Sequence, residues 1–374
     1  MKSSAIISVL AGAIFAAVEA TVFTPPAELN AIVENGNVNI MDILKSRVGT
    51  GSSCTSENVV IRKTWGDLSD ENKREYIAAV QCLMQKAPIT PLDEVPGVRS
   101  RYDDFGATHL NQTASIHWTS NFFSFHRYFT WSYEKALRDE CGYTGTQPYW
   151  DWAHSDTLEE NPLFDGSDLS VGGNGAHVEN VISFVILPTP VPVNTTRTDG
   201  TGGGCITSGP FVNMSINLGP RGAPIADGTQ YNPRCLSRNF RNEAVATSLT
   251  YGAIQSVLEQ PDLQSLSTQM STSNGLHGNG HLSQGGLQDD LWTSALDPSF
   301  HFHHAAVDRV WSIWQAQNQT ERVGQISDTR TIMNQPPSEN GNLNDIVDLG
   351  YSGGRFTIGE LSSTIDGPFC YIYQ

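Results

Sequence analysis

The sequence predicts a mainly α fold with a helical centre and a loop-rich periphery. Apolar residues recur with helical spacing in several segments, and Gly and Pro, 34 and 19 of 374 residues, supply many turns. Residues 160–240 are rich in Gly, Pro, Asn and Thr. With 39% hydrophobic and 16% charged residues the chain can build a core, so disorder is disfavoured. We expect one domain over 21–374, with 160–240 as a long irregular excursion.

The first twenty residues have the features of a secretory signal peptide. Lys2 gives a positive start, residues 5–17 are an apolar run, and Val18 and Ala20 place small residues at −3 and −1 of a cut after Ala20. A membrane anchor is disfavoured because the run is too short to span a bilayer, and no second apolar run of about 20 residues follows. We therefore expect a secreted, extracellular protein.

Glycosylation motifs and cysteines fit secretion. Four N-x-[ST] sequons predict surface positions for N-glycans, at Asn111, Asn194, Asn213 and Asn318. The six cysteines form an even set without metal-binding spacing, which favours disulfides in an oxidising compartment. Of the possible pairings we prefer those that join consecutive cysteines, Cys54–Cys82 and Cys205–Cys235. A net charge of −17 repels phosphate backbones, which disfavours nucleic-acid binding.

Two helices are expected in the first half of the chain. Residues 69–86 repeat apolar side chains on one face, and Ser69 is a suitable N-cap. Residues 119–138 give a stronger pattern, because aromatic and His side chains fall at i, i+3, i+4, i+7 and i+11. These side chains are Phe122, Phe125, His126, Phe129 and Tyr133.

The second half predicts three more helices. Residues 243–260 and 276–284 are candidates, and 298–317 is the clearest. Asp297 is a good N-cap for this last helix, and Pro298 suits its first position.

The histidines are the most informative residue type. Most of the ten lie in three clusters: His109, His117 and His126; His277 and His281; His301, His303 and His304. A lone His on an apolar face is usually a core residue, but burying so many rings without a ligand would leave their nitrogens unpaired. The clusters therefore predict metal binding. His154 and His177 lie outside them and are expected on the surface or in loops.

Spacing suggests how the rings meet. His277 and His281 are one helical turn apart, about 6 Å along the axis, which suits two ligands of one metal. Their segment is a poor helix, because each of Gly275, Gly278 and Gly280 costs about 1 kcal/mol relative to Ala. A bound metal, which contributes roughly 10 kcal/mol or more in structural sites, would offset that cost.

The remaining ligands are less well defined by spacing. His117 and His126 are half a turn out of phase, so His117 must lie before or at the start of the helix that carries His126. His109 is then expected from a preceding loop. Periodicity does not choose between His303 and His304. Imidazoles suit copper, zinc, iron or nickel, and without carboxylates or thiolates iron oxygenase sites and Fe–S clusters are disfavoured.

Several motifs resemble those of the tyrosinases and catechol oxidases. H-x7-H-x8-H at His109, His117 and His126 resembles their first copper region, and G-L-H-x3-H followed by D-P-S-F-H-F-H-H resembles the second. Three shorter motifs are similar to conserved segments of this family: R-K-T-W at 62–65, P-Y-W-D-W at 148–152 and Y-I-Y at 371–373. The resemblance covers about residues 60–374.

The resemblance implies a fold, a cofactor and a ligand set. A central four-helix bundle would hold two copper ions, surrounded by long loops and a few short strands. The first copper would be held by His109, His117 and His126, and the second by His277, His281 and His304. Phe300 would overhang the second copper, and Asp308 would orient a ligand ring. Gly278, Leu282 and Gln269 would lie around the substrate pocket or the ligands.

Departures from the family pattern bear on the activity. Ser115 stands where many fungal members have a Cys that is linked to the second His. Gly278 replaces an Asn, and Thr268 and Gln269 stand where a water-holding Glu is expected. Because that Asn–Glu pair is thought to help deprotonate monophenols, the resemblance implies oxidation of o-diphenols, and of o-aminophenols that Gly278 leaves room for.

Other functions remain open at this point. The first alternative is a tyrosinase that hydroxylates monophenols. A haemocyanin-like O2 carrier shares the paired-copper core, and a zinc-stabilised binding module is a third alternative that metal analysis would separate.

Overall fold

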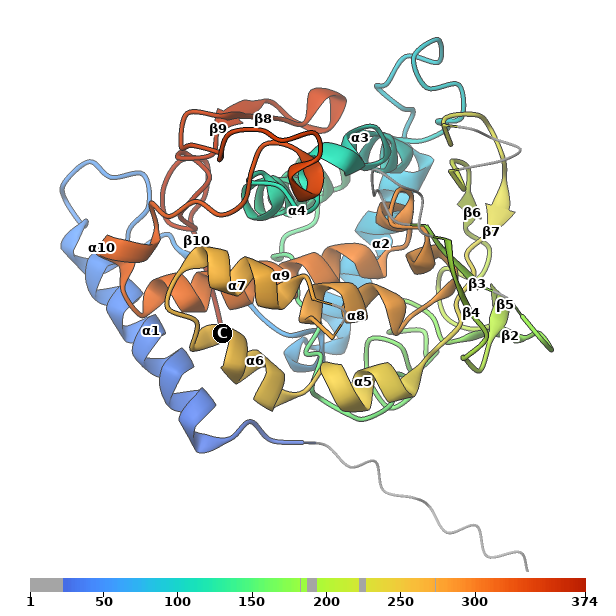
Figure 1. The fold of residues 1–374 in the computed structure, drawn as a ribbon, viewed down its shortest axis with the longest axis horizontal. Coiled ribbons are helices and arrows are strands. Elements are labelled where there is room, and N and C mark those ends of the chain that lie inside the picture. The colour runs from blue at the N-terminus through green and yellow to red at the C-terminus, as the bar shows by residue number, and fades with distance from the viewer. Residues whose placement is uncertain (1–22, 182, 187–193, 222–226, 273) are drawn as a thin grey trace, which may run out of the picture.

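A computed structural model describes residues 23–181, 183–186, 194–221, 227–272 and 274–374, so the predicted signal peptide lies outside the described residues. The fold is mainly α, as expected (Figure 1). The helices are α1 Ala27–Ser46, α2 Asp70–Gln85, α3 Arg101–Ile116, α4 Phe122–Cys141, α5 Asn242–Ser248, α6 Tyr251–Leu258, α7 Leu263–Met270, α8 Leu276–Leu282, α9 Ser299–Ala316 and α10 Gln319–Arg322. None of these helices is long and apolar enough to cross a bilayer.

The described strands are short and pair two by two. They are β1 Val60–Arg62, β2 Gly175–His177, β3 Ser183–Ile186, β4 Asn194–Arg197, β5 Gly203–Ile206, β6 Ser215–Ile216, β7 Arg234–Cys235, β8 Ile346–Asp348, β9 Arg355–Thr357 and β10 Tyr371–Tyr373. The pairs β2–β5, β3–β4 and β6–β7 lie within the expected excursion, on one side of the helices in Figure 1.

Local capping explains where helices begin. The Ser69 hydroxyl accepts from Asn72 N and starts α2, as predicted. Ser100 and Asp103 form a capping box at the start of α3, a helix that we did not predict. The prediction of a single helix over 243–260 is wrong. It is two helices, because Thr250 adopts an extended conformation and caps Ala253 N at the start of α6.

The longest predicted helix in the second half begins one residue later than expected. α9 starts at Ser299, with Pro298 as its N-cap. The Asp297 carboxylate accepts from Ser299 N at 2.9 Å and also forms a two-pronged ion pair with Arg238. Asp297 therefore stabilises the helix start and ties it to the excursion.

Three motifs far apart in the sequence meet beside α9. β1 runs parallel to β10, with Arg62 opposite Tyr373. Tyr149 N donates to Lys63 O at 3.0 Å, and Trp150 N donates to Phe302 O at 3.1 Å. The short motifs of the sequence thus form one layer that supports the helix carrying the last histidines.

All six cysteines are paired. Cys205–Cys235 is confirmed and ties β5 to β7. The expected Cys54–Cys82 pair is wrong: Cys54 bonds Cys370 and Cys82 bonds Cys141, with Cα–Cα distances of 5.2 and 5.9 Å. Nearness in sequence misled because α2 and α4 pack side by side, and β10 returns the end of the chain to the start.

Candidate metal centre

The first trio of imidazoles, defined as His109, His117 and His126, comes together in the core. His117 is the C-cap of α3 and precedes α4, as its phase required, and His126 lies on α4. The expectation of a loop for His109 is wrong, because it lies on α3. All three rings are buried, and one nitrogen of each lies within 4.8 Å of the others.

Main-chain carbonyls orient every ring of the first trio. Nδ1 of His109, His117 and His126 lies 3.1, 2.9 and 2.8 Å from the carbonyl oxygens of Trp292, Thr113 and Phe122, respectively. A carbonyl only accepts, so Nδ1 carries the proton in each ring. Each Nε2 then presents a lone pair, and each is buried without a hydrogen-bond partner. Three converging lone pairs are the donor set of an imidazole-bound metal.

The rings of the second trio, defined as His277, His281 and His304, are also buried and also bring one nitrogen each close together. His277 and His281 lie on α8, and His304 lies on α9. Nε2 of His281 is 3.3 Å from Nε2 of both other rings. In a tetrahedral site with metal–nitrogen bonds of about 2.0–2.1 Å, ligand nitrogens lie about 3.4 Å apart. The described rings therefore fit a metal ion at their centre.

The structure distinguishes His304 from His303. Both nitrogens of His303 are engaged, since Nδ1 accepts from Trp152 Nε1 at 3.2 Å and Nε2 lies 3.1 Å from the carbonyl of His277. His303 therefore has no free lone pair, although it lies near the second trio. Its bonds hold α8 against the layer that contains Trp152.

Packing explains one of the unfavourable glycines of α8. A Cβ on Gly280 would lie 2.0 Å from Cε1 of His303, so only Gly admits that ring. A Cβ on Gly278 would meet nothing closer than 3.9 Å, at the Thr272 carbonyl. Gly280 thus serves the packing of the site, whereas Gly278 leaves open space.

The two trios are adjacent, and Phe300 lies between them. The rings of His126 and His304 stack with centroids 4.2 Å apart. Phe300 is buried, with its ring 4.1 Å from that of His304 and 5.0 Å from that of His109. α4 and α9, which carry His126 and His304, pack against each other (Figure 1). The arrangement is that of a two-metal site.

Burial keeps these imidazoles neutral. Desolvation lowers the pKa of every ring in both trios, that of His109 to about 3 and that of His281 to about 4. Metal ligands must be neutral imidazoles, so the surroundings prepare the rings for an ion.

A cavity of about 190 Å³ opens beside the second trio. Its lining includes His277, His281, Gly278 and Leu282, together with Trp118. Gly278 and Leu282 therefore lie where the resemblance implied.

Gln269 does not line this cavity. It lies on α7, and its amide donates to the Ser256 hydroxyl at 2.7 Å, so the expectation for Gln269 is wrong. Through this bond its side chain faces α6.

Asp308 has a structural role that the sequence did not indicate. Its carboxylate accepts from Arg127 Nε at 2.5 Å and from the hydroxyls of Tyr371 and Tyr373 at 2.6 and 2.7 Å. The expectation that it orients a ligand ring is therefore wrong. It joins α4, α9 and β10 in the core, where Arg62 is also within 3.5 Å.

The remaining histidines, His301, His177 and His154, belong to neither trio. His301 is buried and stacks on Tyr133 with centroids 3.5 Å apart. His177 is exposed on β2, and His154 is half-buried in a turn. Both fit the expectation of surface or loop positions.

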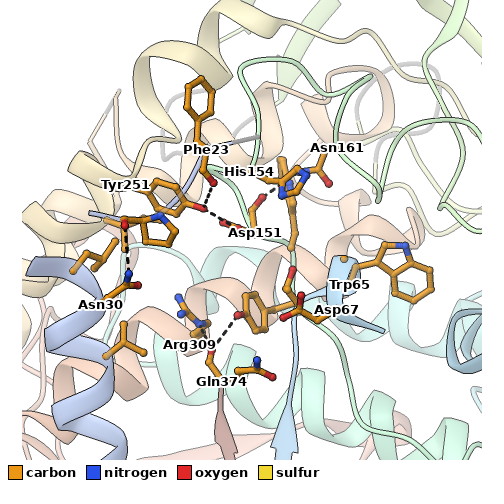
Figure 2. A pocket seen from close by; sticks show the side chains of 18 of the residues that line it. Phe23, Asn30, Trp65, Asp67, Asp151, His154, Asn161, Tyr251, Arg309 and Gln374 are labelled. Atoms are coloured by element: carbon orange, nitrogen blue, oxygen red, sulfur yellow. Dashed lines mark hydrogen bonds between the residues drawn. The ribbon is translucent and has the colours of Figure 1, made fainter. Parts of the chain in front are cut away.

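A larger cavity, of about 630 Å³, contains none of the six imidazoles (Figure 2). It lies between the N-terminal segment, Trp65 and α6, where the Tyr251 hydroxyl bonds the Asp151 carboxylate at 3.1 Å. Arg309 and Gln374 also line it, and the Arg309 guanidinium donates to the Gln374 carbonyl. Cavity size alone would therefore have pointed away from the two trios.

Comparisons with known proteins point to one family. The model of the common central domain of tyrosinase matches residues 99–317. A tyrosinase-like protein of Emericella nidulans is 41% identical over 75% of this chain and 81% of its own length. Tyrosinase P of Aspergillus terreus is 37% identical over 84% of this chain and 91% of its own length. The N-acetyl-6-hydroxytryptophan oxidase of Emericella nidulans is 34% identical over 86% of this chain and 94% of its own length. A solved polyphenol oxidase from Thermothelomyces thermophila superimposes with a TM-score of 0.87 at 37% identity, covering 94% of this chain and 99% of that one.

Proposed function

This chain belongs to the tyrosinase family of copper oxidoreductases, and on that premise we propose that it oxidises o-diphenols to o-quinones while O2 is reduced to water. Two catechols each give up two electrons and two protons, and one O2 takes up the four electrons and four protons to become two waters. The observation that carries the proposal is the pair of adjacent imidazole trios with converging Nε2 atoms.

The family implies a dinuclear copper centre, and the two trios fit it. The first trio would hold one ion and the second trio the other. Copper bound there supplies the exchange of electrons with phenols and O2. The protein supplies the rest: it fixes the imidazoles, keeps them neutral and excludes water from the aromatic core around Phe300.

The cavity lining supports o-diphenol oxidation over monophenol hydroxylation. Hydroxylation requires a base that takes the phenol proton. Among the described residues that line the cavity beside the second trio, the carboxylate is Asp289. Both of its oxygens accept from Arg241 at 2.7 Å, so it is held as an ion pair. Catechols need less help, because their oxidation inserts no oxygen.

The substrate range follows from the open space over Gly278. Because Gly278 leaves room at the cavity wall, o-diphenols and o-aminophenols larger than tyrosine would be accepted. One similar protein from Emericella nidulans, the N-acetyl-6-hydroxytryptophan oxidase, is named for a bulky hydroxylated aromatic substrate, which is consistent with this proposal.

Secretion and glycosylation belong to the same proposal. The signal-peptide pattern supports export after cleavage behind Ala20. Of the sequons, Asn111, Asn213 and Asn318 are exposed, which supports N-glycans at these positions, and Asn194 is the fourth candidate. The region 21–374 would be one domain.

Metal analysis combined with an oxygen electrode tests the function. We expect two copper ions per purified chain and rapid O2 uptake with a catechol, but a long lag or no uptake with the matching monophenol. Uptake on the monophenol without added catechol would instead establish the tyrosinase alternative. Copper binding and reversible O2 binding without oxidation of catechol would indicate the carrier, and a single zinc would contradict both.

A further inference from the structure

One ligand of the second trio is oriented by a side chain. Nδ1 of His281 lies 2.6 Å from Oε1 of Gln288, which follows α8 in the chain. Both groups are buried. The direction of this hydrogen bond decides the tautomer of His281, and the tautomer decides whether Nε2 presents a lone pair to a metal.

The orientation of the Gln288 amide is fixed by its other contacts. Nε2 of Gln288 lies 3.3 Å from the Ser294 carbonyl and 3.2 Å from the Ser299 hydroxyl. A carbonyl only accepts, so the amino group of the amide must face Ser294. The amide oxygen then faces His281, and that oxygen only accepts.

A second glutamine fixes the proton of Ser299. Nε2 of Gln284 donates to the Gly280 carbonyl at 2.8 Å, so the Gln284 oxygen faces Ser299 and accepts its hydroxyl proton. With its only proton used, the Ser299 hydroxyl must accept from Gln288. The main-chain carbonyls of Gly280 and Ser294 therefore determine the direction of every hydrogen bond in the series Gln284, Ser299, Gln288 and His281.

We propose that Gln288 is the positioning residue of the second copper site: it fixes the proton of His281 on Nδ1 and so aims the Nε2 lone pair at His277 and His304. The inference rests on the proposed copper function. Gln288 is not one of the residues that the spacing of the histidines or the family motifs indicated. Partners of metal-bound histidines typically govern affinity by 10–100-fold.

The first test compares two matched variants. Gln288→Met removes the bond to His281 and keeps a side chain of similar length. Gln284→Met removes two bonds from the same buried chain but leaves the contacts of Gln288 with Ser294 and His281 in place. Copper retention against a competing chelator is measured for each. We expect Gln288→Met to weaken the second copper by about 10–100-fold with the first unchanged, and Gln284→Met to keep both.

Equal loss of the second copper in both variants would overturn the proposal, because packing and not the His281 bond would then be responsible. Retention of two copper ions with wild-type affinity in Gln288→Met would overturn it as well.

The second test needs no variant to fold. The ¹⁵N–¹H spectrum of the histidine rings in the metal-free wild-type protein reports which nitrogen carries each proton. We expect the Nδ1–H tautomer at His281, and the Nε2–H tautomer there would contradict the proposal. Because this spectrum involves no copper, it stands or falls separately from the proposed function, which fails if the loaded protein does not oxidise catechol.

Discussion

The first trio of imidazoles is oriented by main-chain carbonyls, whereas in the second trio one ring, that of His281, is oriented by a side chain. Each Nδ1 of the first trio faces a carbonyl oxygen. In the second trio His281 uses Gln288, and Nδ1 of His304 is buried without a partner. α8 itself is held by His303 through the His277 carbonyl.

This difference indicates which of the two trios tolerates amino-acid substitutions around it. A main-chain carbonyl persists through most substitutions, so the first trio is a property of the fold. The second trio depends on particular side chains around a short helix that contains glycines, so single substitutions reach it. We therefore expect the first copper to be the robust one and the second to be the one that sequence variation tunes.

The largest effect is expected from removing one imidazole of either trio. His126→Ala and His304→Ala should each abolish catechol-dependent O2 uptake, because both ions of a two-metal site are required. Metal analysis should show about one copper per chain in each variant. His177→Ala, at an exposed site, is the control and should retain both ions and activity. Full activity with a single copper would contradict the claim that both trios must hold an ion.

Acid should act on both trios alike. Burial lowers the pKa of these imidazoles, to about 3 at His109 and about 4 at His281, from about 6.5 in the unfolded chain. Below about pH 6.5 the unfolded chain takes up protons that the folded chain does not. These rings therefore do not reduce the free energy of unfolding of the metal-free protein above about pH 6.5. This free energy should fall toward the folded pKa values, by about 1.4 kcal/mol per pH unit for each such ring.

Urea unfolding of the metal-free protein at a series of pH values measures this slope. A free energy of unfolding that is flat between about pH 6.5 and 4 would contradict the burial of the rings in both trios.

Asp308→Asn tests the framework that both trios share. The change leaves Arg127 beside a neutral partner in the core, which should cost about 3–5 kcal/mol in the free energy of unfolding. Copper content per folded chain should stay the same, because the hydrogen bonds of Asp308 go to Arg127, Tyr371 and Tyr373 and not to a ligand ring. Asp345→Asn, which weakens the more exposed pair with Arg330, is the control and should lower the free energy of unfolding far less. Selective loss of one copper from Asp308→Asn would contradict this role.

The smallest effects distinguish two glycines of one helix. Gly280→Ala places a methyl group against His303 and should destabilise the protein by about 1–3 kcal/mol, lowering the Tm. Gly278→Ala meets open space and should raise stability by up to about 1 kcal/mol through helix propensity, while it narrows the cavity. Thermal unfolding with catechol kinetics measures both, and changes of the same sign in Tm would be inconsistent with these packing roles.

The sequence predicted much of this arrangement, and its failures have physical causes. Helical spacing and motif resemblance brought the six imidazoles together. α3 was missed because its apolar pattern is weak, although the S-x-x-D capping signal at Ser100 and Asp103 marks its start. Asp308 and Gln288 act through contacts with residues distant in sequence or in other segments, and these contacts follow from packing that spacing does not contain.

Anomalous diffraction at the copper edge from crystals of the copper-loaded protein tests the central claim most directly. We predict two peaks about 3–5 Å apart, each within about 2.0–2.1 Å of three Nε2 atoms, one set from the first trio and the other from the second. A single peak, or a peak bound by His303 in place of His304, would contradict the two-trio account.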